Sequence, residues 1–225
     1  MPKEQIVSAK LVALTQPTLE TPASGPEDLV AFCARVSSGR EYEDRGKDYK
    51  GLLKYCMRNK HWSVFEMANA VVEVKAPRDI SRQLLRHRSF SFQEFSQRYS
   101  DDIELCSREI RKQDQKNRQN SFTPEEWFGE EDAIWDDNLS WLAANSKDCY
   151  RWAINNGIAK ECARVILPEG LTMSTLYVNG TIRSWLHYLD VRDDPGVTQA
   201  EHVWLAQAIR KALEPALPTL LGKGV

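Results

Sequence analysis

Apolar and polar positions repeat along this chain with two periods, and the pattern predicts both strands and helices. Residues 69–75 (NAVVEVK) alternate valines with charged side chains, as a strand does when one face is buried and the other meets solvent. Two more stretches, rich in residues common in strands, predict strands at Ile6–Leu14 and Leu171–Val178. The chain therefore supplies strands for a sheet from both of its halves.

Apolar residues spaced three or four apart predict helices between these strands. Their ends are marked by prolines at first helical positions, by Gly157, and by two capping boxes, in which a Thr and a Glu three residues later satisfy exposed backbone N–H groups. We expect helices at Pro26–Ser37, Tyr49–Arg58, Pro77–Arg88, Ile158–Leu167 and 181–192, a broken helical region from the capping box Thr123–Glu126 to Asn156, and a last helix from the capping box Thr198–Glu201.

Residues 107–150 form the least regular part of the pattern. Their most polar segment, RKQDQKNRQN, is highly charged, so it predicts a solvated helix or a surface excursion. The chain has no internal repeat and no long linker. We therefore expect residues 1–225 to form one α/β (α+β) domain, which at this length buries a substantial core.

Composition and charge disfavour several functional classes. The formal net charge of −2 argues against a protein that binds nucleic acid non-specifically. The sequence has no apolar run of about eighteen residues, which argues against a membrane span, and its first residues lack the features of a signal peptide. The five cysteines form no CxxC pair, so we expect reduced thiols, a cytoplasmic protein and no metal site.

The stretch 86-RHRSFSFQEFSQR-98 concentrates cations, hydroxyl groups and one carboxylate. Arginine is suited to phosphate and carboxylate ligands because its guanidinium donates to two oxygens at once. On a helix that reaches residue 88, the side chains of Gln83, Arg86 and His87 share one face. This helix face would present an amide, a guanidinium and an imidazole together.

The end of the same stretch adds a second group of polar side chains. If residues 94–98 are extended, Glu94, Ser96 and Arg98 line one side of the strand. Such a wall suits a nucleotide, because a guanidinium can bind its phosphate and a hydroxyl its sugar or base. The alternative interpretation is a structural ion pair between Glu94 and either Arg86 or Arg98.

The order and spacing of this stretch resemble a family signature. The pattern Arg86-His87-Arg88-x-x-Ser91-x-Gln93-x-x-Ser96-x-Arg98 is similar to the signature RHRxxSxNxxSxR of the flavin-dependent thymidylate synthases, with glutamine where the family has asparagine. Several collinear segments are more specific than one motif. Further segments resemble the family in the same order: 34-ARVSS-38, 61-HWSVFE-66, 74-VKAPRDISRQLLRHR-88, 163-ARVILP-168, 178-VNGTIRSWLHYLDVR-192 and 199-QAE-201.

The resemblance implies an α/β domain with a central, mostly antiparallel sheet and long flanking helices. It also implies synthesis of dTMP from dUMP by reductive methylation, without an enzyme nucleophile. Methylenetetrahydrofolate then gives the carbon, and NADPH supplies reducing equivalents through bound FAD. The resemblance further implies a homotetramer with shared active sites. From charge and hydropathy we expect no nucleic-acid or membrane partner.

The same resemblance assigns site residues by position. Contacts with dUMP are implied for Gln83, Arg86, Glu94, Ser96, Gln97, Arg98, Arg164 and Arg192. Contacts with FAD are implied for Ser37, His61, Ser63, Glu66, Arg86, His87, Arg88, Asn179, Arg183 and His187. In the reaction, Arg192 is expected to stabilise negative charge on the uracil and His87 to stabilise the reduced flavin. Ser96 is expected to bind the nucleotide rather than attack it, because no base lies next to it in the motif.

Spacing and composition support some of these assignments. Arg183 and His187 are four residues apart, so they share one helix face. Arg164 lies in the otherwise apolar segment ARVIL, where a buried guanidinium needs an anionic partner such as a phosphate.

Two alternatives to an active synthase remain open. A relative that kept the fold and lost the activity is compatible with the departure at Gln93. A nucleic-acid-binding module would use Arg86, Arg88, Arg98 and the neighbouring aromatic residues as a stacking strip. The net charge and the acidic stretch GEEDAIWDD disfavour this second alternative.

Overall fold

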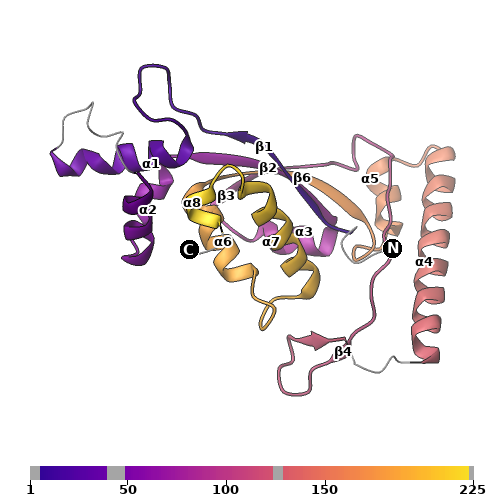
Figure 1. Ribbon diagram of the computed structural model, residues 1–225. Helices are drawn as coiled ribbons and strands as arrows, with labels where there is room; N and C mark the ends of the chain where they lie inside the picture. The colour runs from indigo at the N-terminus through magenta and orange to yellow at the C-terminus, as the bar shows by residue number, and fades with distance from the viewer. Residues whose placement is uncertain (1–5, 40–48, 124–128, 223–225) are drawn as a thin grey trace.

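A four-stranded antiparallel sheet forms the centre of the computed structural model, which describes residues 6–39, 49–123 and 129–222 (Figure 1). All neighbouring strands are antiparallel, so the prediction of a mostly antiparallel central sheet is confirmed. In spatial order the strands are β1 (Ser8–Leu14), β2 (Asn69–Pro77), β6 (Met173–Thr181) and β3 (Phe90–Glu94).

Eight α-helices and three short 3₁₀ helices surround the sheet within the described residues. The α-helices are α1 (Pro26–Ala34), α2 (Tyr49–Arg58), α3 (Arg78–Leu85), α4 (Glu130–Asn155), α5 (Lys160–Ala163), α6 (Ile182–Arg192), α7 (Ala200–Leu213) and α8 (Pro218–Leu221). The 3₁₀ helices are η2 (Arg35–Ser38), η4 (Trp62–Glu66) and η5 (Arg164–Ile166). A small hairpin pairs β4 (Lys112–Gln113) with β5 (Ser121–Phe122).

The two faces of the sheet differ because side chains alternate along each strand. On one face, Val72 and Val74 of β2 lie opposite Val178 and Leu176 of β6, and all four are fully buried. Helices α3, α6 and α7 pack on the sheet, as Figure 1 shows. The other face of β6 leaves Tyr177 exposed. The core therefore lies between one face of the sheet and these helices.

The start of β3 is held by an aromatic side chain that lies over a glycine. Phe90 pairs with Gly180 of β6, and its ring centroid lies 4.5 Å from that of the buried Trp185 on α6. A Cβ atom at Gly180 would lie only 2.3 Å from a ring carbon of Phe90. Only glycine admits the ring here, and the ring in turn fixes where β3 leaves the turn that carries His87.

A buried carboxylate on α1 joins this helix to α8 near the end of the described chain. Glu27 of α1 accepts hydrogen bonds from the backbone N–H groups of Thr219 and Leu220, at 2.8 and 2.9 Å. These N–H groups belong to the first turn of α8, whose backbone donors lack the full set of helical partners; that of Leu220 also donates to the carbonyl oxygen of Leu217 at 3.2 Å. The contact fixes α8 against the helices of the N-terminal part.

The 26-residue helix α4 stands apart from the helices that cover the sheet and runs beside α5 (Figure 1). Only a small cluster around Tyr150, Ala153 and Ala163 buries apolar surface there. Trp141 and Trp152 of α4 are 66% and 62% exposed. None of the helices within 6–39, 49–123 and 129–222 is both long and apolar enough to cross a membrane.

Most of the predicted helices and strands are present, but several begin or end at other residues than predicted. Helix α2 has the predicted limits, and α6 begins one residue later than expected. Helix α3 ends at Leu85, three residues before the predicted end, because residues 86–89 turn into β3. The segment predicted as a helix over Ile158–Leu167 holds one α-helical turn and η5.

One predicted capping box is wrong and the other lies outside the described residues. The last helix begins at Ala200 with Gln199 at the N-cap, and no side chain caps it. Glu201 does not turn back to the helix end because its carboxylate binds Arg111 instead. Of the box Thr123–Glu126, only Thr123 is described.

The polar segment after residue 107 is neither a helix nor a purely solvated excursion. It runs as an extended chain into the β4–β5 hairpin. The side chains of Arg108 and Arg111 are only 11% and 12% exposed. Both arginines dock on the body of the protein through Glu201.

Substitution of Gly180 tests the contact between β6 and β3. We expect Gly180→Ala to lower the free energy of unfolding by about 1–3 kcal/mol, because the new methyl group overpacks the Phe90 ring. This corresponds to a melting temperature lower by about 3–10 °C, measurable by calorimetry. Gly170→Ala is the matched control, since a Cβ atom there meets nothing within 4 Å. Equal melting temperatures for the two variants would contradict the role given to Gly180.

Candidate functional site

The turn between α3 and β3 faces the end of α6. Arg86 is the C-cap of α3, and His87 follows it in the turn. The Nε2 atom of His87 accepts a hydrogen bond from Nε of Arg192 at 3.0 Å. The His87 ring also meets Tyr188 edge to face, with centroids 5.1 Å apart. Residues separated by more than one hundred positions thus form one cluster.

The hydrogen bond from Arg192 determines the protonation of His87. A guanidinium only donates hydrogen bonds, so Nε2 of His87 carries the lone pair and its proton lies on Nδ1. Burial, with the charges of Arg192 and His187, lowers the pKa of His87 to about 4. His87 is therefore neutral near pH 7 and acts as a hydrogen-bond acceptor for Arg192.

Gln83 lies in a polar chain between α3 and α7. Its amide nitrogen donates to Oε1 of Gln199 at 2.8 Å. Its amide oxygen lies 3.1 Å from Nδ1 of His202, whose Nε2 lies 3.1 Å from the hydroxyl of Tyr188. Burial is the main cause that lowers the pKa of His202 to about 3, with smaller contributions from Arg192 and His87.

The segment after β3 is not extended over all of residues 94–98. Strand β3 ends at Glu94, which accepts a hydrogen bond from the Ser174 hydroxyl at 2.8 Å. A turn follows, in which the Ser96 hydroxyl accepts from the backbone N–H of Arg98 at 3.3 Å. Glu94 pairs with no arginine among the described residues, so the predicted alternative of such an ion pair is wrong.

Gln97 and Arg98 in this turn differ in burial and in their partners. Gln97 is only 4% exposed, and its amide oxygen accepts from Arg78 at 2.8 Å. Arg98 is exposed and its Nε lies 3.2 Å from a carboxylate oxygen of Glu161 on α5. The amide oxygen of Gln97 is thus already engaged, whereas Arg98 points to the surface beside α5.

Arg164 is not the buried residue that its apolar neighbours suggested. It begins η5, where it is half-buried, and the adjacent Val165 is 80% exposed. The physical reason is that α5 and η5 pack on α4 at the edge of the molecule, where little protein covers them. Arg164 remains close in sequence to Glu161, the partner of Arg98.

A cavity of about 1160 Å³ opens between the end of α2, η4, α6 and α8. Its wall combines apolar side chains with several charged ones, as expected for a site that binds a large amphipathic ligand. The charged or titratable side chains are Lys60, Glu66, Arg183, His187, Asp190 and Arg210. The apolar side chains include Met57, Trp62, Leu186, Leu189, Leu220 and Leu221.

Several residues expected at the flavin contribute to this cavity. Arg183 and His187 are both exposed on one face of α6 while Leu186 and Leu189 are buried, so the predicted shared face is confirmed. Arg183 forms an ion pair with Glu66 of η4. The ion pair links η4 to α6 across the cavity wall.

His61 is oriented by the way α2 ends. The N–H of Lys60 donates to Met57 and that of His61 to Cys56, at 3.2 and 2.9 Å. These are the two bonds of a Schellman motif. They require the positive φ of 58° seen at Lys60, a conformation that glycine adopts more readily. The motif leaves His61 exposed, with its ring edge to face with Tyr55.

Other expected site residues remain outside this cluster and cavity. Asn179 is exposed on β6, in line with Tyr177 on the face of the sheet away from the core. Ser37, Ser63 and Arg88 are exposed in η2, η4 and the turn after α3. Within the described ranges, none of these four side chains makes a polar contact with another expected site residue.

Sequence reasoning missed a set of polar residues that the structure brings to the site. Gln199, His202 and Tyr188 contact Gln83 directly or in series. Ser174 contacts Glu94. The resemblance of residues 199–201 to the family was the one available signal, because a buried polar residue on an amphipathic helix looks like part of its solvent face.

The chain is similar to known proteins along almost all of its length. The family model described as "Thymidylate synthase complementing protein" matches residues 18–219. A probable flavin-dependent thymidylate synthase from Paramecium bursaria Chlorella virus 1 is 45% identical over 222 residues, covering 95% of this chain and 97% of that protein. A flavin-dependent thymidylate synthase from Synechocystis sp. is 42% identical with the same coverage.

A solved structure shares the fold. The crystal structure of a UMP/dUMP methylase, PolB from Streptomyces cacaoi bound with 5-Br dUMP, superposes with a TM-score of 0.75 at 25% identity. The match covers 95% of this chain and 92% of that chain.

The lowered pKa values of His87 and His202 predict an unusual titration. We expect their ring resonances to keep neutral positions in NMR spectra from about pH 8 to about pH 5.5, while histidines of the urea-unfolded chain titrate near 6.5. His87→Gln and His202→Gln assign the signals. Because the pKa of His87 falls from its ordinary 6.5 to about 4 on folding, its stabilisation is complete above pH 6.5 and is lost as the pH falls towards 4. A midpoint near 6.5 in the folded protein would contradict the burial described.

Proposed function

The chain belongs to the flavin-dependent thymidylate synthase family, an enzyme family, and from this membership and its site we propose that it makes dTMP from dUMP. In the proposed reaction methylenetetrahydrofolate gives the carbon and NADPH gives reducing equivalents through FAD. The observation that carries the proposal is the hydrogen bond between Arg192 and His87. It joins a residue expected at the nucleotide to one expected at the flavin, so the two ligands can lie side by side.

The cavity beside α6 has the chemistry that a flavin requires. Its apolar wall, with Trp62 and Leu186, suits a planar ring system, and its cations suit a pyrophosphate. We propose that Arg183, His187 and Lys60 hold FAD there, with Glu66 orienting Arg183 through their ion pair. When bound, the flavin supplies the reduction chemistry that no protein side chain provides.

We propose that the cationic residues beside α5 bind the nucleotide phosphate. Arg98 is exposed beside Glu161, and Arg164 follows on the same segment. The Ser96 hydroxyl lies in the same turn as Arg98. A phosphate that binds both guanidinium groups would replace the surface ion pair between Arg98 and Glu161, and such pairs are individually weak.

Arg192 then acts on the reacting base. As a permanent donor held by His87, its guanidinium can stabilise negative charge on a uracil oxygen, and this charge makes the adjacent ring carbon nucleophilic. No covalent attack by the protein is required. Neutral His87 accepts from Arg192 and fixes its direction.

We further propose that the complete site forms between chains of a homotetramer. Asn179 and Arg164 do not reach the cavity within one chain. Trp141, Trp152 and Val165 expose large apolar surfaces on α4 and η5, and such surfaces usually mark contacts with another protein. An assembly that covers them would bring separate parts of the site together.

UMP is the second candidate substrate, because the structural neighbour PolB is named a UMP/dUMP methylase. The relatives at 42–45% identity are named thymidylate synthases, which favours dUMP.

Gln93, the departure from the family signature, is exposed on regular strand β3 opposite Tyr177. Its extra methylene therefore disturbs no backbone geometry, which weakens the case for an inactive relative. Membership of this enzyme family argues against the alternative of a nucleic-acid-binding module.

The direct test follows flavin absorbance of FAD-reconstituted protein under anaerobic conditions. We expect NADPH to bleach the bound flavin and dUMP to change the rate of bleaching, because the two sites adjoin at His87 and Arg192. Addition of methylenetetrahydrofolate should then yield dTMP, measured by chromatography. Parallel reactions with UMP decide between the two substrates. Protein that retains no flavin and does not respond to NADPH would refute the proposal.

Ser96→Ala distinguishes binding from nucleophilic catalysis. We expect kcat/KM for dUMP to fall by about tenfold, as for one lost hydrogen bond to a charged group. Loss of a true nucleophile would cost on the order of a millionfold. Complete inactivity in a variant that still binds dUMP and flavin would show that Ser96 takes part covalently.

A further inference from the structure

A buried carboxylate lies at one end of the polar chain that reaches Gln83. Glu201 is 1% exposed and accepts two hydrogen bonds from Nη2 of Arg111, at 2.6 and 2.7 Å. Arg108 lies 3.4 Å from the same carboxylate. Burial acts to raise the pKa of Glu201, but the hydrogen bonds from Arg111 and the charges of both arginines outweigh it and lower the pKa. Glu201 is therefore an anion.

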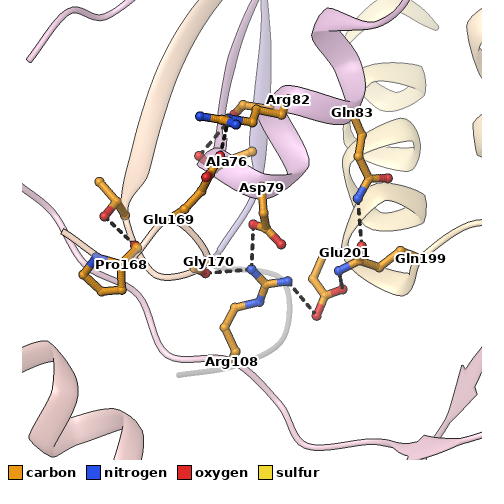
Figure 2. Close-up of polar contacts among 12 residues, drawn as sticks. Ala76, Asp79, Arg82, Gln83, Arg108, Pro168, Glu169, Gly170, Gln199 and Glu201 are labelled. Carbon is orange, nitrogen blue, oxygen red and sulfur yellow. Dashed lines mark hydrogen bonds and ion pairs between the residues drawn. The ribbon is translucent and has the colours of Figure 1, made fainter. Parts of the chain in front are cut away.

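The two arginines are themselves held in place. Arg108 donates to Asp79 of α3 at 2.9 Å and to the carbonyl oxygen of Gly170 at 2.8 Å, as Figure 2 shows. The guanidinium of Arg111 lies over the ring of Trp204, 5.9 Å from its centroid. The polar segment after residue 107 thus supplies fixed countercharges for Glu201.

An ionised carboxylate determines the direction of every hydrogen bond that follows it, because it can only accept. Gln199 must turn its NH₂ group to Glu201, and these atoms lie 3.0 Å apart. The Gln199 oxygen then faces Gln83 and must accept from its NH₂ group, at 2.8 Å. Figure 2 shows these three side chains in series. The amide of Gln83 is therefore left with one orientation.

The same order of donors and acceptors continues from Gln83 through His202 to Tyr188 on α6. With its NH₂ group turned to Gln199, Gln83 presents its oxygen to Nδ1 of His202, which must carry the proton. Nε2 of His202 then accepts from the Tyr188 hydroxyl, which is fully buried and remains protonated. His202 can adopt only the Nδ1–H tautomer, and each bond in the series depends on the charge of Glu201.

We propose that Glu201 is a positioning residue that, through Gln199, holds the Gln83 amide with an N–H group available to the bound nucleotide. One hydrogen of the Gln83 NH₂ group is used by Gln199, and the other has no partner among the described residues. The phosphate and uracil carbonyl oxygens of a nucleotide can only accept hydrogen bonds, so they need this N–H. A flipped amide would present its carbonyl oxygen to them instead and repel them. The inference rests on the proposed function, which puts dUMP at Gln83.

Substitutions of similar volume test the series of hydrogen bonds that runs from Glu201 through Gln199 and Gln83 to His202. Gln199→Met removes both hydrogen bonds of the middle link, and Glu201→Gln removes the charge. Gln207→Met is the matched control, because Gln207 is exposed on the same helix. Far-UV circular dichroism and melting establish that each variant is folded. If Glu201→Gln fails to fold because Arg111 loses its partner, Gln199→Met alone decides.

The first measurement is the tautomer of His202 from ¹⁵N shifts of histidine-labelled protein with FAD bound. We expect Nδ1–H in the wild type and in Gln207→Met, and a mixture with Nε2–H in Gln199→Met and Glu201→Gln. The second measurement is steady-state kinetics. We expect KM for dUMP to rise about five- to tenfold in both site variants, the effect of one misoriented hydrogen bond, with kcat changed less than about twofold because the reacting atoms are untouched.

The outcomes separate this inference from the proposed function. An active wild type with the Nε2–H tautomer, or with an unchanged KM in Gln199→Met, overturns the role of Glu201 alone. A wild type that binds flavin but never converts dUMP overturns the proposed function, and the inference with it. A shifted tautomer together with a raised KM and a preserved kcat supports both.

Discussion

The position of β6 between β2 and β3 is the constraint on which the rest of the molecule depends. Its antiparallel pairing with both strands joins two segments about one hundred residues apart, because backbone hydrogen bonds in a sheet must be satisfied by neighbouring strands. Helix α6 leaves β6 directly, so its last residue, Arg192, reaches the turn before β3. The meeting of His87 and Arg192 is a consequence of this strand order.

Charged groups within the fold determine the direction of the hydrogen bonds in the site. Arg192 and Glu201 each have a fixed charge and only one hydrogen-bonding role, donor for the arginine and acceptor for the carboxylate. His87 must accept from Arg192 and Gln199 must donate to Glu201, and Gln83 and His202 follow Gln199 in series. Burial keeps both histidines neutral, so neutral rings can accept and donate in fixed directions without adding charge. The polar groups of this cluster are thus oriented by the protein itself.

The exposed apolar surface of α4 and η5 lies far from this preorganised cluster. Trp141, Trp152 and Val165 are exposed because few residues of the same chain pack on them. The arginines expected at the nucleotide phosphate, Arg98 and Arg164, lie beside that surface. In the proposed homotetramer, contacts that cover the apolar surface would also enclose the proposed phosphate site, so nucleotide binding and assembly would be linked.

The sequence alone determined the local elements and the identity of the family. The valine alternation of β2, the apolar spacing of α2 and α6, and the signature from Arg86 to Arg98 are local patterns, and each was interpreted correctly because period and spacing survive in any tertiary context. Only the tertiary structure decided the state of individual polar groups. Glu201 became a buried anion rather than a helix cap, and His87 became a neutral acceptor for Arg192, because hydrogen-bond partners and burial come from residues distant in the sequence.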